Sequence, residues 1–235
     1  PGCSADSTLD PRSVGSPDRP TAKAVRVSVA PTIDGVIGDQ EWQGVQSLGP
    51  FWRSHGDALA TNQTSVRIGY DEHALYVAFR CEDRDLRASH GTRDAPIYRE
   101  DAVEIFVDPE GSGRDYVEAD ISPRGIVFDA SFHGGPRKNF APSWDAVAQS
   151  AVSVDGTVQS VEADLDRGWQ AEWAIAWETF NHKPDPAKAW RVNFFRVNVD
   201  RSNAGEPDRE ESAWSPPMMG DFHNLVRFGE LWFVP

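Results

Sequence analysis

The chain has 235 residues, a formal net charge of −14, and a hydrophobic fraction of 39%. The acidic surplus argues against nucleic acid as a partner, because binding to phosphates requires clustered lysine and arginine. No apolar run approaches the roughly 20 residues that a membrane-spanning helix needs. Nine Trp and twelve Phe supply a core, while seventeen Pro and nineteen Gly favour many short strands joined by turns.

Residues 1–22 are predicted to form a flexible tail, because they are rich in Pro, Ser, Asp and Gly and contain almost nothing to bury. Cys3 follows Gly2 and precedes small polar residues, as at the lipidation site of a bacterial lipoprotein. In that case Cys3 would tether the protein to a membrane. The alternative, which the sequence leaves open, is a cysteine without a role. Cys81, on the apolar side of a strand, is predicted to be a buried thiol.

From residue 24 the pattern changes to short runs of alternating polarity, which predict strands. Val25, Val27 and Val29 would form one face of the first strand. A single helical turn at residues 39–42 would bury Trp42. Residues 66–70 and 75–81 read as a hairpin.

Residues 98–108 combine a charged turn with a strand. Val103, Ile105 and Val107 point to one side of this strand, and Glu104, Phe106 and Asp108 to the other. The first side is therefore predicted to face the core. A core strand needs nothing acidic, so Glu104 marks a candidate functional face.

Later segments continue the same pattern. Residues 147–154 and 158–163 are predicted to form a hairpin, and residues 168–175 a strand that buries Trp169 and Trp173. Residues 177–181 would form a short helix, and residues 201–213 a polar loop that leads to Trp214. Residues 23–235 are therefore predicted to be one all-β domain. We expect a two-sheet antiparallel β-sandwich, immunoglobulin-like or jelly-roll-like, with one or two short helices.

The order of these segments resembles carbohydrate-binding module family 9. The resemblance covers roughly residues 24–234. Its motifs are Ile33-Asp34-Gly35 with Glu41-Trp42, Val66-Arg67-Ile68-Gly69-Tyr70-Asp71 with Leu75-Tyr76-Val77, Asp101-Ala102-Val103-Glu104-Ile105-Phe106-Val107-Asp108, Gly168-Trp169-Gln170-Ala171-Glu172, Trp190-Arg191-Val192-Asn193-Phe194, Trp214-Ser215-Pro216 and Phe228-Gly229-Glu230-Leu231.

The resemblance implies a β-sandwich that clamps a sugar, in known cases at its reducing end, between two aromatic rings. One ring falls on Tyr98, where the family usually has tryptophan, and the other on Trp214. The family's sugar-binding acid falls on Glu104, and an arginine of its binding face falls near Asp120. Family members can also bind structural calcium, although no ligand set for it is matched in this sequence.

Sugar chemistry supports this set of residues, because pyranose C–H faces pack on aromatic rings while hydroxyls need charged partners. Further candidate polar contacts are Arg99, Glu118 and Arg196. Other interpretations stay open: Trp214 as a core residue, Glu104 and Glu118 as a catalytic pair, and both glutamates as structural ion-pair partners of Arg67, Arg80 or Arg196.

The favoured prediction is a non-catalytic, monomeric module that binds a saccharide outside the cytoplasm. One alternative is a haem-carrying electron-transfer domain, because Met218, Met219 and His223 lie close together and Met and His can ligate haem. The other is a scaffold or interaction module that has lost its sugar site.

Overall fold

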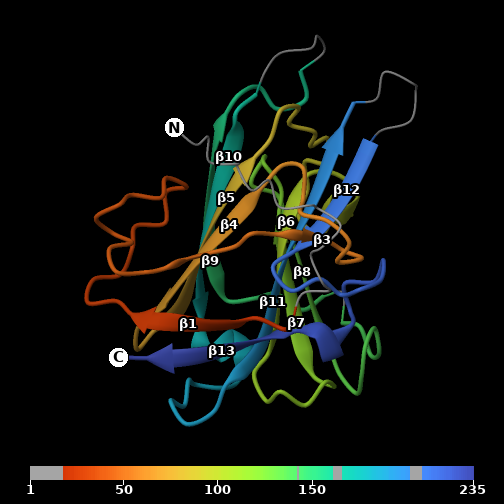
Figure 1. Cartoon of the computed structure of the whole chain (residues 1–235). Coiled ribbons are helices and arrows are strands. Elements are labelled where there is room, and N and C mark those ends of the chain that lie inside the picture. Colours follow the sequence, from red (N-terminus) through yellow and green to blue (C-terminus); the bar gives the residue numbers. More distant parts are fainter. Residues whose placement is uncertain (1–17, 142, 161–165, 202–207) are drawn as a thin grey trace, which may run out of the picture.

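The computed structural model describes residues 18–141, 143–160, 166–201 and 208–235. Strands dominate these residues (Figure 1). The strands are β1 (Thr21–Arg26), β2 (Ser47–Leu48), β3 (Trp52–Arg53), β4 (Thr64–Tyr70), β5 (Ala74–Glu82), β6 (Ala102–Asp108), β7 (Tyr116–Ile121), β8 (Val127–Phe132), β9 (Ala148–Asp155), β10 (Gly168–Ala176), β11 (Trp190–Asp200), β12 (Asp208–Ala213) and β13 (Gly229–Val234). The helix α1 (Trp177–Phe180) and the 3₁₀ turns η2 (Ile97–Arg99) and η3 (Leu225–Arg227) complete the described elements.

The strands form one continuous hydrogen-bonded sheet in the order β8-β7-β6-β11-β13-β1-β4-β5-β10-β9. This sheet curls, so that the half containing β6, β7, β8 and β11 packs against the half containing β4, β5, β10 and β9 (Figure 1). The predicted all-β sandwich is thus confirmed. Most pairs are antiparallel, but β1 pairs in parallel with both β13 and β4 and joins the two halves.

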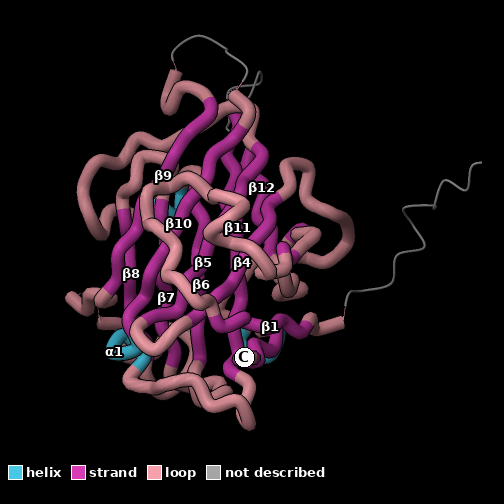
Figure 2. The backbone as a smooth tube through the Cα atoms, turned by 90° about the vertical axis from the view of Figure 1, so that its left-hand side faces the viewer, coloured by secondary structure: helices cyan, strands magenta, loops and turns pink. Residues whose placement is uncertain are grey.

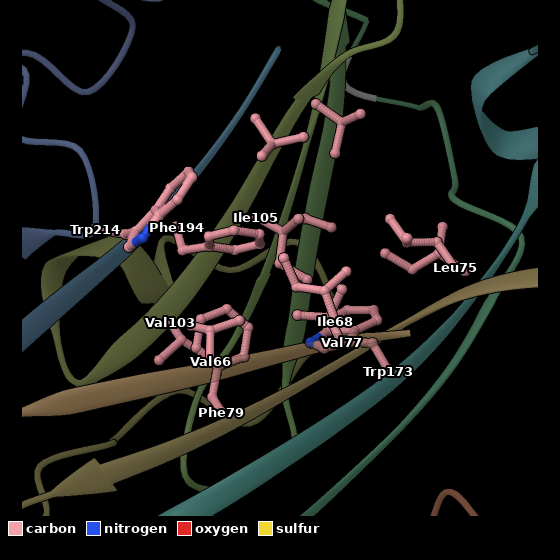
Figure 3. Close-up of a cluster of buried hydrophobic side chains, with 14 of the residues drawn as sticks. Val66, Ile68, Leu75, Val77, Phe79, Val103, Ile105, Trp173, Phe194 and Trp214 are labelled. Carbon is pink, nitrogen blue, oxygen red and sulfur yellow. The ribbon is translucent and has the colours of Figure 1, made fainter. Parts of the chain in front are cut away.

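The main core lies between the two halves of the sheet. Trp169 and Trp173 of β10 and Phe79 of β5 meet Ile105 of β6 and Phe194 of β11, all at most 2% exposed. Figure 3 shows Phe79 and Trp173 on one side and Ile105 and Phe194 on the other, pointing toward one another from the facing strands. Such burial removes a large apolar area from water, which is the main favourable term in folding.

Several predicted elements are confirmed. The hairpin of β4 and β5 is antiparallel from Thr64 to Tyr70, and Trp42 is 1% exposed. The helix α1 lies at one end of the strands (Figure 2). No helix in the described part of the chain is long and apolar enough to cross a membrane. Cys81 is buried as predicted, and its burial raises the pKa of the thiol to about 12.

Two local predictions are wrong. The strand β1 begins at Thr21 and buries Ala22, so the predicted tail of residues 1–22 extends two residues too far. The strand ends at Arg26; Val25 and Val27 pack on one cluster as predicted, but Val29 is exposed. In addition, β9 pairs with β10 rather than with residues 158–163. Of that segment, residues 158–160 form no strand, while 161–163 lie outside the described residues, as does Cys3.

Candidate functional site

The strand β6 separates the core from a second, smaller cluster of buried side chains. As predicted, Val103, Ile105 and Val107 pack in the main core. Glu104 and Phe106 point the other way, where Phe106 packs with Tyr116 and Phe132 of β7 and β8. This outer face of the β6–β7–β8–β11 half therefore positions the acidic side chain that a core strand does not require.

A pocket of about 390 Å³ opens on this face. Glu104 and Glu118 line it together with Glu211, Arg137, Arg209 and His223. The aromatic residues of its wall come from four separate parts of the chain: Tyr98, Phe128 with Phe132, Phe140, and Phe222. The pocket is therefore polar at the sheet and lined with rings around it, which is the usual composition of a small-molecule site.

Three carboxyl groups meet where the pocket touches the sheet. Glu104 on β6 lies directly opposite Asp120 on β7, and Glu118 lies two residues before Asp120 on the same face. One oxygen from each group can be chosen so that all three lie within 4.8 Å of one another. Their exposed fractions are 2% for Glu104, 6% for Glu118 and 0% for Asp120. We call these three residues the carboxylate cluster.

Burial changes the protonation of the carboxylate cluster. Desolvation raises the pKa of Glu104 and Asp120 well above their ordinary values, and mutual repulsion between the carboxylates adds to the rise. Desolvation raises the pKa of Glu118 to about 8, although Arg137 acts in the opposite direction. At neutral pH the cluster therefore retains protons, and a protonated carboxyl can donate a hydrogen bond as well as accept one.

These raised pKa values predict a pH-dependent stability for protein treated with EDTA. Glu118 has an ordinary pKa of 4.5 and a folded pKa of about 8, so between these values the folded protein binds more protons than the unfolded chain. Its favourable contribution is fully present below pH 4.5 and is lost as the pH rises through 8. Thermal unfolding followed across this range should show Tm falling, and Glu118→Gln should flatten the fall. The exposed control Glu82→Gln should retain the wild-type slope; equal slopes for both variants would contradict the prediction.

The basic residues of the pocket are engaged by acidic partners outside the carboxylate cluster. Arg137 donates to Asp221 at 2.8 Å, and Arg209 donates to Glu211 at 2.7 Å and to the Tyr98 carbonyl at 2.9 Å. Both nevertheless act on the cluster at longer range, where each lowers the pKa of Glu104.

His223 is buried in the same wall. Its Nδ1 lies 2.6 Å from the Tyr116 hydroxyl, and its Nε2 lies 3.8 Å from a Glu118 oxygen. Desolvation lowers the pKa of the imidazole to about 4, so the ring is neutral at neutral pH. Because both ring nitrogens face protein groups, this arrangement does not favour the haem alternative.

The structure does not bring Trp214 to the pocket, which corrects the predicted pairing of Tyr98 with Trp214. Trp214 is 6% exposed, lies beside Phe194 in the main core (Figure 3), and packs against Gly229. The preceding residues form β12, which pairs with β11 and β3 rather than making a loop. Because β12 brings Trp214 directly onto β11, the ring is sealed inside the protein, where it cannot stack on a sugar.

Arg196 is also corrected from a ligand contact to a structural residue. It is fully buried, pairs with Asp83, donates to Asn198 at 2.9 Å, and lies over the Trp169 ring at 5.1 Å. The guanidinium of Arg196 also lies 4.0 Å from Asp101. It points to the side of β11 opposite Phe195, which packs in the second cluster below the pocket.

Three of the six predicted ligand residues line the pocket, namely Tyr98, Glu104 and Glu118. Arg99 does not; it is exposed, and its guanidinium lies 5.8 Å from the Tyr98 ring. Among the described residues, Glu104 and Glu118 form no ion pair with Arg67, Arg80 or Arg196. Arg196 pairs with Asp83 instead, and Arg67 contacts Asp39. Sequence reasoning missed Asp120 and the four phenylalanines; alternation along β7 could have placed Asp120 beside Glu118.

The protein is thus a curled β-sandwich module with a pocket on its outer face. Acidic side chains lie at the base of the pocket, and aromatic rings form its wall. The chain belongs to the carbohydrate family 9 binding domain-like family, which matches residues 33–234. It is 26% identical over 179 residues to a protein of Arthroderma benhamiae named "Extracellular protein", covering 73% of this chain and 79% of that one.

Two solved proteins share the fold. A protein of Bacteroides uniformis aligns with a TM-score of 0.70 at 18% identity, over 91% of this chain and 99% of its own. A family 9 carbohydrate-binding module of Caldicellulosiruptor kristjanssonii, solved with glucose, aligns with a TM-score of 0.63 at 16% identity, over 92% and 96%. Another structure of a family 9 carbohydrate-binding module of Caldicellulosiruptor kristjanssonii, solved with cellotriose, aligns with a TM-score of 0.56 at 16% identity, over 91% and 93%.

Proposed function

We propose that the pocket binds one end of a saccharide and does not cleave it. The observation that carries this proposal is the combination, in one open pocket, of aromatic rings with two buried carboxyl groups at its base. Membership of the carbohydrate family 9 binding domain-like family supports the same ligand class. The ligand would be clamped by Tyr98 together with phenylalanines of the wall, in place of the predicted Tyr98–Trp214 pair.

The chemistry of the pocket suits a pyranose. Tyr98 is 36% exposed and Phe140 is 45% exposed, so both present ring surface on which sugar C–H groups can pack. Glu104 and Glu118 provide oxygens that accept hydrogen bonds from sugar hydroxyls, and their protonated forms can also donate to hydroxyl oxygens. The pocket volume of about 390 Å³ lies within the range of small-ligand sites.

A glucose-containing oligosaccharide is the proposed ligand, held by its reducing end. Family 9 modules of Caldicellulosiruptor kristjanssonii with the same fold were solved in one structure with glucose and in another with cellotriose, which supports this choice. An extracytoplasmic location is supported by the Arthroderma benhamiae relative named "Extracellular protein". Tethering through Cys3 is a further proposal, because that residue lies outside the described residues.

Isothermal titration with glucose, cellotriose and borohydride-reduced cellotriose tests the proposal. The wild-type protein should bind glucose and cellotriose but should not bind reduced cellotriose, because reduction opens the sugar ring at the reducing end. Tyr98→Ala and Glu104→Gln should each weaken binding about tenfold or more, corresponding to about 1.4 kcal/mol for a lost aromatic anchor or a lost hydrogen bond to a carboxyl oxygen. Chromatography of cellotriose after overnight incubation should show no hydrolysis.

Two controls isolate the pocket. Tyr98→Phe keeps the ring and should retain most of the affinity, whereas Glu82→Gln removes an exposed carboxylate outside the pocket and should change nothing. Binding that survives Glu104→Gln would place the ligand elsewhere. A folded wild type that ignores a panel of mono-, oligo- and polysaccharides would instead favour the scaffold interpretation.

A further inference from the structure

The carboxylate cluster places more negative charge at the base of the pocket than the surrounding protein neutralises. Among the described residues, Glu104, Glu118 and Asp120 are the one group of three or more acidic, His or Cys residues whose potential ligand atoms lie within 4.8 Å of one another. All three side chains are buried, and taking unpaired carboxylates out of water is costly. The cluster therefore needs a positive partner or bound protons.

Asp120 is the clearest sign that a partner belongs there. It is 0% exposed, and neither of its oxygens accepts a hydrogen bond from a backbone N–H, a basic side chain or a hydroxyl group of the described residues. The polar group that faces it is another acid, the Glu118 carboxyl. Buried carboxylates that have only a structural role are normally satisfied by hydrogen bonds. Asp101, which is equally buried, illustrates the difference, because its two oxygens accept from the backbone N–H groups of Arg87 and Val199.

The nearby arginines do not provide this partner. Arg137 donates to Asp221, and Arg209 donates to Glu211 and to the Tyr98 carbonyl. His223, the remaining basic side chain of the wall, holds the Tyr116 hydroxyl at Nδ1 and only approaches Glu118 to 3.8 Å through Nε2. The space between the three carboxyl groups is thus left to a group from solution.

The geometry fits a calcium ion. Calcium binds six to eight oxygens at about 2.3–2.6 Å, so two oxygens on opposite sides of one ion lie at most about 5 Å apart. The three cluster oxygens, all within 4.8 Å of one another, meet this limit. Magnesium demands near-ideal octahedral geometry and keeps several of its waters, so it is less suited to three clustered carboxyl groups. Oxygen ligands without sulfur or nitrogen also favour a hard cation.

We propose that Glu104, Glu118 and Asp120 hold a calcium ion whose remaining coordination positions take hydroxyl oxygens of the saccharide. Three side chains fill only part of the coordination shell. Glu104 and Glu118 line the open pocket, so the unfilled positions face the space where the ligand enters. Adjacent sugar hydroxyls provide oxygen pairs suited to a hard cation. The part of this inference that concerns sugar rests on the proposed function, whereas the calcium site itself does not.

Calcium binding is measured first, without sugar. Protein treated with EDTA and then dialysed against metal-free buffer is titrated with CaCl₂ and separately with MgCl₂ by calorimetry. We expect one calcium per chain with a Kd of about 10⁻⁴–10⁻³ M, and at least tenfold weaker magnesium binding. Asp120→Asn should lose calcium binding, while Asp39→Asn, which removes an exposed carboxylate on the surface, should retain it. Circular dichroism checks the fold, and Glu118→Gln serves as the second variant if Asp120→Asn unfolds.

Cellotriose binding is then compared in calcium and in EDTA. Affinity lost in EDTA and restored by CaCl₂, but not restored in Asp120→Asn, supports the proposal. Absence of calcium binding to the wild type, with protons alone in the cluster, overturns it even where cellotriose binds. Calcium binding without any effect on cellotriose affinity overturns the bridging role. Calcium binding with no saccharide bound in either buffer supports the calcium site and instead counts against the proposed function.

Discussion

Replacing Arg196 with methionine is expected to destabilise the protein by about 3–5 kcal/mol. The substitution removes the buried partner of Asp83 and the neighbouring charge at 4.0 Å from Asp101, both of which are at most 1% exposed. Breaking a buried ion pair from one side leaves uncompensated charge in the interior, which explains the large effect. Methionine retains much of the packing against Trp169, so the loss reports mainly on charge. Urea denaturation at neutral pH measures it.

The matched control for this substitution is Arg53→Met. Arg53 donates to Glu210 at 2.8 Å, but its side chain is 47% exposed. An exposed ion pair contributes at most about 1 kcal/mol, so the control should change the free energy of unfolding by no more than that. If Arg196→Met lowers the free energy of unfolding by no more than Arg53→Met, the buried ion pair of Arg196 does not have the structural role described above. Saccharide affinity of the folded Arg196→Met fraction should remain close to that of wild type.

Truncating Trp214 to alanine should also destabilise the protein, by about 3–5 kcal/mol. The ring fills the space between Phe194 and the backbone at Gly229. Its deletion therefore leaves a cavity in the main core. Thermal and urea unfolding measure the loss, and binding assays at low temperature show whether the folded fraction still holds cellotriose.

Tyr98→Ala is expected to have the opposite effects to Trp214→Ala, with a loss of binding rather than a loss of stability. Tyr98 is partly exposed at the pocket, so its truncation should weaken saccharide binding while changing stability by less than about 1 kcal/mol. Trp214→Phe keeps an aromatic ring in the core and should retain wild-type affinity. If Trp214→Phe abolishes binding without loss of stability, Trp214 acts as a ligand contact and the burial described here does not represent the binding state.

The sequence predicts best those features that depend on local alternation. The two faces of β6 follow from Val103, Ile105 and Val107 alternating with Glu104 and Phe106, and the structure confirms them. The same alternation identifies β10, whose Trp169 and Trp173 are buried as predicted. These elements are recognisable because strand side chains alternate strictly between faces, whatever the chain does elsewhere.

Trp214 shows where this reasoning fails. The polar residues of β12 (Asp208–Ala213) suggest a loop, yet they pair with β11 and with the two-residue strand β3. A strand at the margin of a sheet can carry polar side chains, because hydrogen bonding along the backbone rather than apolar burial holds it in place. A strand then delivers the next residue to the interior, whereas a loop would have left it at the surface.

The walls of the pocket could not be predicted from local pattern either. Tyr98, Phe128, Phe140 and Phe222 lie in four different segments and meet only because the β6–β7–β8 layer and the segment before β13 fold over one face. Nothing in the neighbourhood of Phe140 or Phe222 in the sequence distinguishes these rings from surface or core residues. Asp120 was foreseeable as a neighbour of Glu104, but its lack of a hydrogen-bond donor is a property of the packed structure alone.

The parallel pairing of β1 with β13 has a mechanical consequence. Thr21 lies beside Glu230 and Val25 beside Val234, so the strands run in the same direction over five residue pairs (Figure 1). Opposing forces applied before β1 and after β13 would slide the two strands past each other rather than peel them apart. The hydrogen bonds along all five pairs would bear the load at the same time. The neighbouring strands β4 and β11 pair with β1 and β13 on their other sides. The fold therefore joins its first and last described strands in the shear geometry, which resists a pulling force better than the peeling of an antiparallel hairpin.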